Sequence, residues 1–440
     1  MSEWGEKPLG ELATIRVSNV DKKSLASEYP VRLCNYMDVY SGTYLDDEVE
    51  YMEATASARE IANFSLQIGD VVITKDSESP DDIGIPAVVD RTAGGLVCGY
   101  HLAMLRPEKS KVDPLFLLKQ IETDAVRRFY LKQAAGSTRY ALSTGTIEAT
   151  PIKLAPLEQQ RIIARILRTI DTQIEVTEKL ITKQERVRAG LMQDLFTRGV
   201  DEHGRLRPPR EEAPHLYHQT ELGWLPLGWE APELEDLLAP VPTPMRSGPF
   251  GSALLKHELV DSGVPLLGID NIHVEHFKAD FTRFVTRRKF SELSRYRVLP
   301  DDVVITIMGT VGRCCVIPDG FGEMLSSKHL WTISLDQSKA LPKLVCWQLG
   351  HATWVDSWFR KKSQGGIMDA IQSSTLKRLR LPMPTLPEQS RMTAIYEETT
   401  SHLGRMREEY AKLTLQKSGL MQDLLTGKVS VAPLLESAAA

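Results

Sequence analysis

The chain of 440 residues is too long for one hydrophobic core, so we expect two or more domains. Its hydrophobic content of 42% and charged content of 25% are those of an ordinary globular protein, and no apolar run reaches the roughly eighteen residues of a membrane span. The net charge of −5 argues against nucleic acid as the only partner, because a dedicated nucleic-acid-binding protein is usually basic overall.

The first residues, 1–6, do not resemble a signal peptide, so we expect a cytoplasmic protein without membrane association. The five cysteines form neither a C-x-x-C pair nor a plausible zinc set. Their spacing is typical of buried, reduced thiols. We therefore expect no metal ion in this chain.

Residues 1–155 alternate short β-like runs with turn signals. The clearest predicted strands lie at 31–33, 70–74 and 87–89, where β-branched residues dominate. Residues 114–130 then show the apolar periodicity of an amphipathic helix. Strands and helices that mix without strict alternation favour an α+β domain.

Residues 156–198 predict one long helix. Its apolar and small residues recur at steps of three and four, which places them along a single narrow seam. A seam this narrow suits a helix that packs along one partner helix, and about forty residues would form a rod of about 60 Å. The seam residues are Ile163, Ile166, Ile170, Thr177, Leu180, Val187 and Leu191, with Gln173 and Gln184 in the two remaining positions.

Residues 199–223 form a charged, proline-rich stretch that is typical of a linker. Residues 224–386 then repeat the plan of the first domain. The run Asp-Val-Val-Ile-Thr at 70–74, for example, returns at 302–306. We therefore expect a second globular domain of related design.

Residues 387–427 repeat the long helix. The run Leu-Glu-Gln-Gln-Arg-Ile at 157–162 returns as Pro-Glu-Gln-Ser-Arg-Met at 387–392. Near the other end, Gly-Leu-Met-Gln-Asp-Leu at 190–195 returns unchanged at 419–424. The second seam consists of Met392, Ile395, Thr399, Met406, Leu413 and Leu420, with His402, Glu409 and Gln416 as polar members.

Each seam lacks a partner in its own copy, so we expect the two helices to pack against each other as an antiparallel coiled coil. The alternative is that each helix packs only on its own globular domain. The predicted fold class is thus α+β, a tandem pseudo-two-fold repeat of two globular α/β-type domains, each followed by a long helix. A short C-terminal tail at 428–440 completes the chain.

The sequence lacks the common catalytic signatures. There is no phosphate-binding P-loop, because Gly427-Lys428 is followed by Val429, and there is no Gly-rich dinucleotide or methyl-donor turn. His101 and His329 occupy matching places in the two domains, which favours buried or turn-forming roles over catalysis. These absences indicate a recognition protein without catalytic residues of its own.

Basic and aromatic residues alternate between positions 281 and 300, and Arg and Lys at that density can neutralise phosphates, while Arg can read guanine edges. Weaker basic clusters occur in the first domain and near residue 360. For any single residue, a solvated basic face is the alternative. The candidate DNA-binding residues are Lys75, Arg127, Arg128, Lys132, Arg139, Tyr140, Arg246, Ser247, Arg283, Arg287, Arg288, Lys289, Arg295, Arg297, Lys361 and Lys362.

The loop Ser-Gly-Pro-Phe-Gly-Ser at 247–252 contains two glycines, which could let the backbone approach a phosphate or a base. A plain turn explains this loop equally well.

Four kinds of segment resemble the specificity subunit of type I restriction-modification systems. They are the Leu-Pro-Glu-Gln type of helix entry at 157–161 and 386–391, the Gly-Leu-Met-Gln-Asp-Leu helix exit, Gly-Pro-Phe-Gly-Ser at 248–252, and Met-Gly-Thr-Val-Gly at 308–312. The first domain lacks the last two segments, so its assignment depends on the second domain.

By this resemblance, each globular domain would be a target recognition domain that reads one half of a split site in double-stranded DNA, and the helices would set the spacer between the halves. The partners would be two methyltransferase subunits and two restriction subunits. S-adenosylmethionine, ATP and magnesium would belong to those partners.

Two other interpretations stay open. One is a coiled-coil scaffold whose two domains bind protein partners. The other is a self-sufficient DNA-modifying enzyme whose site the motifs do not reveal.

Overall fold

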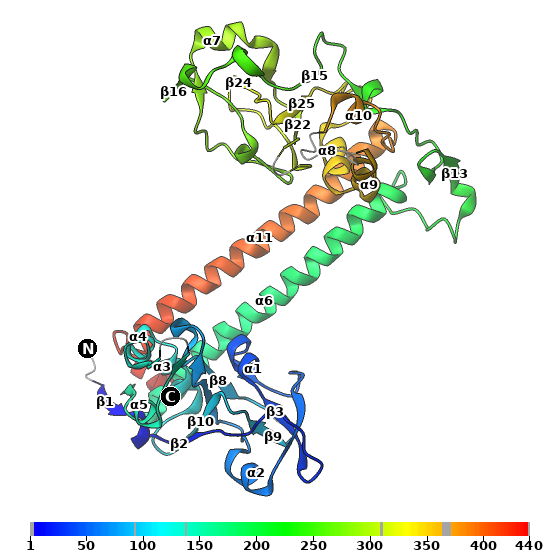
Figure 1. Ribbon diagram of the computed structural model, residues 1–440. Helices are drawn as coiled ribbons and strands as arrows, with labels where there is room; N and C mark the ends of the chain where they lie inside the picture. Colours follow the sequence, from blue (N-terminus) through cyan, green and yellow to red (C-terminus); the bar gives the residue numbers. More distant parts are fainter. Residues whose placement is uncertain (1–3, 92–93, 137–138, 309–310, 363–370, 439–440) are drawn as a thin grey trace. The chain divides into compact units, whose positions relative to one another are not determined.

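The computed structural model describes residues 4–91, 94–136, 139–308, 311–362 and 371–438 (Figure 1). Two units have separate cores, one made of Met1–Leu180 with Met406–Ala440 and the other of Ile181–Arg405. Both limits fall inside the long helices α6 (Leu157–Thr197) and α11 (Leu386–Leu424). Each unit therefore contains one globular domain and one half of each long helix.

The first unit is built on a five-stranded sheet of order β2-β10-β6-β8-β4. These strands are β2 (Ala13–Val17), β10 (Leu102–Pro107), β6 (Val71–Thr74), β8 (Pro86–Val89) and β4 (Tyr44–Leu45). A second sheet pairs β5 (Met52–Ala56), β3 (Tyr29–Cys34) and β9 (Leu96–Cys98). Two short ladders pair β1 (Gly5–Pro8) with β12 (Pro151–Leu154) and β7 (Asp76–Ser77) with β11 (Tyr140–Ala141). The helices are α1 (Tyr36–Ser41), α2 (Ala58–Phe64), α3 (Pro114–Ile121), α4 (Asp124–Gln133) and α5 (Thr144–Glu148).

The second unit is built on a four-stranded sheet of order β15-β25-β22-β23. These strands are β15 (Met245–Arg246), β25 (Leu330–Ile333), β22 (Val303–Thr306) and β23 (Cys314–Val316). A three-stranded sheet has the order β16 (Leu259–Val260), β20 (Phe284–Val285), β17 (Val264–Pro265). Two-stranded ladders join β13 (Tyr217–Thr220) to β14 (Gly223–Pro226), β18 (Ile272–His273) to β19 (His276–Phe277), and β21 (Arg297–Val298) to β24 (Met324–Leu325). The helices are α7 (Arg287–Glu292), α8 (Pro342–His351), α9 (Thr353–Lys362) and α10 (Ser373–Lys377).

The predicted duplication is confirmed by the order of these strands. The sequence β2-β10-β6-β8 in the first sheet matches β15-β25-β22-β23 in the second, strand for strand. The two Val-Val-Ile-Thr runs form the fully buried strands β6 and β22 at the same place in each sheet. β-branched side chains suit such strands because both faces of the sheet are covered.

A glutamine at the entry to each long helix has a structural role, and the structure matches Gln160 with Gln389, one residue away from the alignment of 157–162 with 387–392. Gln160 is fully buried, its Oε1 accepts the backbone N–H of Asp113, and its Nε2 donates to the carbonyls of Lys111 and Ala155. Gln389 repeats this arrangement with three backbone groups of the second unit. Each glutamine thus ties the start of a long helix to the loop before the domain's main helix, α3 or α8.

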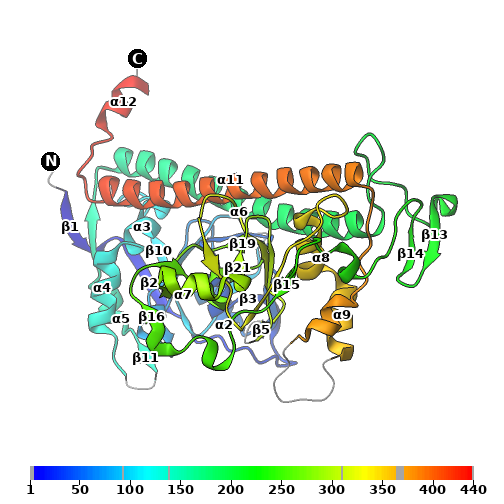
Figure 2. The ribbon, with the colours of Figure 1, turned by 90° about the horizontal axis from the view of Figure 1, so that it is seen from above.

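The predicted antiparallel pairing of the long helices is confirmed within each unit. In the first, Ile163 and Leu167 of α6 share a core with Leu420 and Leu424 of α11. In the second, the later residues of α6 share a core with the earlier residues of α11. Figures 1 and 2 show the paired halves lying side by side. The first half of one helix therefore packs on the last half of the other, which is the antiparallel arrangement.

The seam follows a regular heptad repeat. Every second residue of the observed seam differs from the predicted one. The predicted Leu180 and Val187 are each 49% exposed, whereas Ile174 and Ile181 are half-buried. The predicted polar members Gln173, His402, Glu409 and Gln416 are also exposed. The buried line in α6 runs through Ile163, Leu167, Ile170, Ile174, Thr177, Ile181, Gln184, Arg188, Leu191 and Leu195. In α11 it runs through Met392, Tyr396, Thr399, Leu403, Met406, Tyr410, Leu413, Lys417, Leu420 and Leu424.

The cause of this error is the alternation of steps in a heptad. Seam residues in a heptad are separated alternately by three and by four positions, and the pattern can begin with either step. The two resulting patterns share one position in each heptad. The predicted Ile163, Ile170, Thr177 and Leu191 lie on the shared positions, as do Met392, Thr399, Met406, Leu413 and Leu420. Ile166 and Ile395 are half-buried beside the seam and pack on their domain cores.

Each unit places one carboxylate, buried Asp171 or half-buried Glu275, among cations and a tyrosine. Asp171 of α6 accepts a hydrogen bond from Tyr44 and pairs with Lys119 and Lys417 in the first unit. Glu275 pairs with Arg188 and His351 in the second and accepts a hydrogen bond from the Tyr396 hydroxyl. Burial alone would raise the pKa of each carboxyl, but these partners outweigh burial and hold both pKa values below their usual range.

These two carboxylates predict a loss of stability in acid. Because their pKa values are lower in the folded protein than in the unfolded chain, their contribution is complete above about pH 4.5 and is lost as the pH falls through the folded pKa. We expect the Asp171→Asn/Glu275→Gln variant to lose less stability than the parent between about pH 5 and pH 3. Urea unfolding at each pH measures this, and parallel pH profiles would contradict it.

The stretch predicted as a linker, 199–223, is ordered. Val200 is fully buried, and its backbone N–H donates to Glu388, which also pairs with Arg207. Residues of β13 and β14 then form a hairpin. In the tail, Val431 is buried in the first unit's core and α12 (Ala432–Ala438) follows. None of the helices in the described part of the chain combines the length with the apolar character that a membrane span needs.

Candidate nucleic-acid interface

The matched histidines mark the same place in both domains. His101 lies in the turn that enters β10, and His329 lies in the turn that enters the corresponding strand β25. Both side chains are half-buried, as expected of turn-forming residues. In each unit the histidine lines a surface hollow, and the other lining residues of the two hollows come from different segments.

In the first unit, Asp76 organises the histidine and its neighbours. Its carboxylate accepts from Lys75 Nζ at 2.7 Å, contacts His101 Nδ1, and lies 3.7 Å from Arg139 Nε. Arg139 also donates to His101 Nε2 at 3.3 Å. The imidazole therefore acts as an acceptor at Nε2 and points its Nδ1–H at Asp76. The hollow is lined by Lys22, Tyr36, Met37, Tyr40, Asp76, Ser77, Glu78, Ser79, Asp82, His101 and Arg139.

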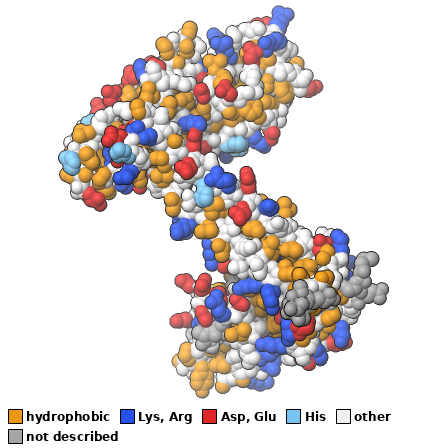
Figure 3. All heavy atoms as spheres, turned by 180° about the vertical axis from the view of Figure 1, so that it is seen from behind, with side chains coloured by type: hydrophobic (Ala, Val, Ile, Leu, Met, Phe, Trp, Pro, Cys, Tyr) orange, Lys and Arg blue, Asp and Glu red, His pale blue; other side chains and the backbone are white. Residues whose placement is uncertain are grey.

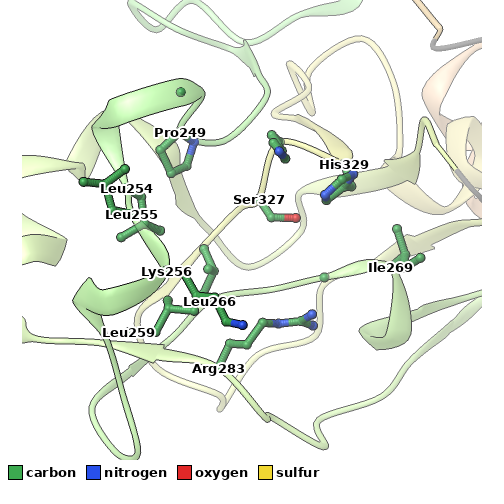
Figure 4. A pocket seen from close by; sticks show the side chains of 13 residues that line it. Pro249, Leu254, Leu255, Lys256, Leu259, Leu266, Ile269, Arg283, Ser327 and His329 are labelled. Carbon is green, nitrogen blue, oxygen red and sulfur yellow. The ribbon is translucent and has the colours of Figure 1, made fainter. Parts of the chain in front are cut away.

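In the second unit, the hollow has apolar walls and a rim of cations (Figure 4). Lys256, Arg283 and His329 reach it from three separate segments. Lys256 and Lys328 make no ion pair within the described part of the chain, whereas Arg283 pairs with Asp270. Burial and the charges of Lys328 and Arg283 lower the pKa of His329, so its ring is neutral at pH 7. The lining residues are Pro249, Gly251, Leu254, Leu255, Lys256, Leu259, Leu266, Gly268, Ile269, Arg283, Ser327, Lys328 and His329.

The two glycines of the 247–252 loop have different roles. A Cβ added to Gly248 would lie 2.0 Å from the backbone oxygen of Ser326, and the Gly248 N–H donates to Ser327 at 3.1 Å. Gly251 takes a φ of +60° and has open space around it. Gly248 is therefore required for packing against the segment that leads to His329, and Gly251 for a turn on the hollow's wall.

Replacing Gly248 with alanine is expected to destabilise the second unit by about 2–3 kcal/mol, because the clash is with backbone that cannot turn away. Thermal unfolding measures the effect. Gly404→Ala in α11 is the matched control, since a Cβ there meets nothing and should stabilise the helix by about 0.5–1 kcal/mol. A neutral result for Gly248→Ala would show that the two segments can separate without cost.

The basic cluster at 281–297 is largely neutralised within the domain. Arg287 pairs with Glu323, Arg288 with Glu292, and Lys289 with Glu258 at 2.8 Å. Figure 3 shows the same mixing of blue and red side chains over the visible face of each unit. Arg295 and Arg297 are exposed and make no ion pair with any described residue. The cluster therefore offers fewer free charges than its sequence indicates.

Arg246 and Ser247 lie inside the domain and require correction as DNA contacts. They are 7% and 6% exposed. The Arg246 guanidinium pairs with buried Asp302 and donates to the backbone oxygen of Arg297 at 2.7 Å. A buried arginine that satisfies a buried carboxylate cannot also bind phosphate, so we remove both residues from the candidate surface.

The remaining candidates of the first unit lie on or beside α4. Arg127, Arg128 and Lys132 are exposed, and Arg127 pairs with Asp81 at 3.3 Å. Tyr140 is half-buried in β11, next to Arg139. The side chains of Lys361 and Lys362 lie outside the described residues.

Sequence reasoning missed the residues that complete the hollows, chiefly Lys256 and Lys328 in the second unit and Tyr36 and Tyr40 in the first. Lys256 and Lys328 lie about seventy positions apart in the chain and meet only through folding. The signal that could have indicated them was the recurrence of the histidine turn in both domains.

The groups that line the hollows are suited to binding phosphates and bases. Within the described residues, no group of three or more His, Cys, Asp and Glu side chains is placed to hold a metal ion. All five cysteines are buried and free, and burial raises the pKa of Cys34, Cys98 and Cys315, which makes these thiols poor nucleophiles. Cations, a neutral histidine and serine hydroxyls can instead bind phosphates and base edges.

Comparison with known proteins agrees with this interpretation. Residues 1–186 match the family model of the type I restriction modification DNA specificity domain. The chain is 23% identical over 333 residues to the type I restriction enzyme MjaVIII specificity subunit of Methanocaldococcus jannaschii, which covers 74% of this chain and 73% of that protein. It is 26% identical over 378 residues to a second protein of that organism, provisionally named the MjaX specificity subunit, covering 84% of this chain and 81% of that one.

The fold has a solved counterpart. The S subunit of a type I restriction-modification system from M. genitalium matches with a TM-score of 0.56 and 15% identity, over 96% of both chains. The family match of residues 1–186 and the two named relatives confirm the resemblance drawn from the helix entry and exit motifs.

Proposed function

Because residues 1–186 match the type I restriction modification DNA specificity domain, and specificity subunits resemble the chain over most of its length, we propose that this protein reads DNA for a type I restriction-modification complex. Each globular domain reads one half of a bipartite site in double-stranded DNA. The chain itself performs no chemistry.

One observation supports this proposal most strongly. The two domains share a strand order, and each presents a hollow with Lys or Arg side chains at the same histidine turn. Two related readers suit a target with two parts, since each domain needs to recognise only a few base pairs. The linings differ in sequence, so the two halves of the site differ in sequence as well.

The partners follow from the same proposal. Two methyltransferase subunits and restriction subunits assemble on this chain in the cytoplasm, and S-adenosylmethionine, ATP and magnesium are bound by those subunits. A net charge of −5 fits this assembly, because partner subunits can supply further positive charge around the DNA.

The direct test is to express the chain with a methyltransferase partner and to sequence the methylated sites. We expect one bipartite sequence with a fixed number of unread base pairs between its halves. Methylation or cleavage of DNA by the purified chain alone would favour the self-sufficient enzyme. Absence of any DNA binding, with retained protein binding, would favour the scaffold.

The length of the helices should set the spacer. Removing one heptad from each helix, residues 177–183 and 403–409, preserves the heptad phase and shortens each helix by about 10 Å, which equals about three base pairs. We expect the methylated site to keep both half-sequences and to lose about three base pairs from its spacer. An unchanged spacer would contradict the role given to the helices.

A further inference from the structure

Each unit contains a buried or half-buried carboxylate where its domain meets the two helix halves. In the first unit, the carboxylate is Asp171 of α6, which is 8% exposed. It accepts a hydrogen bond from the hydroxyl of Tyr44 at 2.6 Å. It also forms ion pairs with Lys119 Nζ of α3 and Lys417 Nζ of α11, each at 2.7 Å. The domain strand β4, the domain helix α3 and both long helices therefore converge on one charge.

In the second unit, the carboxylate is Glu275, in the turn between β18 and β19 of the domain. It accepts a hydrogen bond from the hydroxyl of Tyr396 of α11 at 2.8 Å. It also lies 2.5 Å from His351 Nε2 of α8 and 3.5 Å from Arg188 Nη1 of α6. Arg188 also lies over the Tyr396 ring, 5.4 Å from its centroid. The same four kinds of element again meet at one charge.

The duplication relates the two arrangements, but the carboxylate and the tyrosine are exchanged between the long helix and the domain. Arg188 and Lys417 occupy the same heptad position in the two helices, since 417 − 188 equals 392 − 163. Each is a cation in an otherwise apolar or uncharged seam. The carboxylate comes from a long helix in the first unit and from the domain in the second, and the tyrosine comes from the other side in each case.

Such a contact selects one position of the domain on its helices. If the helix that supplies the seam cation slid by one heptad, the carboxylate would lose Lys417 or Arg188 and keep only Lys119 or His351 of the domain. Losing one member of such a charge cluster costs more than losing an apolar contact. Apolar residues along the seam discriminate much less between registers, because neighbouring heptads carry similar side chains. Buried polar residues in a seam are the best-attested means of specifying register.

We propose that Asp171 and Glu275 are positioning residues that hold each recognition domain in one orientation on its helix pair and so restrict the spacer that the protein accepts. This inference rests on the proposed function. It concerns residues whose contacts join a domain to its helices, so half-site sequence and spacer tolerance are separable readouts.

The test uses the complex with its methyltransferase partner and a set of duplexes whose spacer differs from the preferred one by one base pair. For Asp171→Asn and Glu275→Gln, the ratio of methylation at the preferred spacer to that at the altered spacers should fall about tenfold, with the half-site sequences unchanged. Glu108→Gln and Glu235→Gln, which alter exposed ion pairs in the first and second units, are matched controls and should keep the parent ratio. Arg188→Lys, which keeps the positive charge, should also keep the parent ratio.

A uniform fall at all spacers, with the ratio preserved, would overturn the inference, because the carboxylates would then only stabilise the fold. If Glu275→Gln does not fold, Tyr396→Phe removes one donor and should lower the ratio about threefold. Hydrogen exchange in the β18–β19 turn and α8 gives a readout that needs no DNA, and it should be faster in Glu275→Gln than in Glu235→Gln. If the parent complex recognises no bipartite site, the proposed function is wrong. Equal hydrogen-exchange rates in Glu275→Gln and Glu235→Gln would contradict the positioning role alone.

Discussion

Replacing Asp302 with alanine is expected to destabilise the second unit by about 3–5 kcal/mol, because Arg246 is left buried without its counter-charge. The two side chains are 2% and 6% exposed. Asp302 also accepts the backbone N–H of Leu299 at 2.7 Å and the hydroxyl of Ser334, so the loss includes further buried donors. Urea unfolding, with hydrogen exchange in β22 to identify the affected unit, measures the effect.

The first unit supplies a matched control. Asp70 immediately precedes the equivalent strand β6 and pairs with Arg106 at 2.7 Å, but the Arg106 side chain is 31% exposed and can turn to water when its partner is removed. Asp70→Ala should therefore cost about 1–3 kcal/mol. The double variant Arg246→Met/Asp302→Leu should restore most of the stability, since no buried charge remains. Equal effects of Asp70→Ala and Asp302→Ala would contradict the role given to burial.

The second large effect is expected in DNA binding. Lys256 and Lys328 approach the second hollow without an ion pair to any described residue, so replacing both with alanine removes two charges that are free to bind phosphate. We expect the affinity of the assembled complex to fall at low salt, and the slope of log K against log salt concentration to decrease by about 2. Binding isotherms at several salt concentrations measure both.

The comparison variant is Arg287→Ala/Arg288→Ala, which removes the same formal charge from the sequence-predicted cluster. These arginines already pair with Glu323 and Glu292, so the slope should decrease by less than about 1. The opposite order of the two variants would place the DNA on α7 and away from the hollow.

Several features were predictable from the sequence because they depend on local or repeated patterns. The two long helices extend over nearly the predicted ranges, since an apolar periodicity of about forty residues has few alternatives. The duplication was visible in Asp-Val-Val-Ile-Thr and in the helix motifs, and matching sequence predicted matching strand order. The antiparallel pairing followed from two seams that needed a partner.

Other features were not predictable, and the reasons are physical. The order of steps in the heptad was ambiguous, so Leu180 and Val187 were placed on the wrong face. Arg246 looked like a free cation, because the buried Asp302 that binds it lies 56 positions further along the chain. The charge of the 281–297 cluster was overestimated for the same reason, since two of its acidic partners, Glu258 and Glu323, come from distant segments.

The sequence by itself determined the tandem plan of this protein, the extent of its helices and the family that it resembles. Only the tertiary structure decided which cations are free, which are neutralised inside the fold, and where the hollows lie. The physical reason is that periodicity acts between neighbours in the chain, whereas the availability of a charge depends on every group that folding brings within a few ångströms of it.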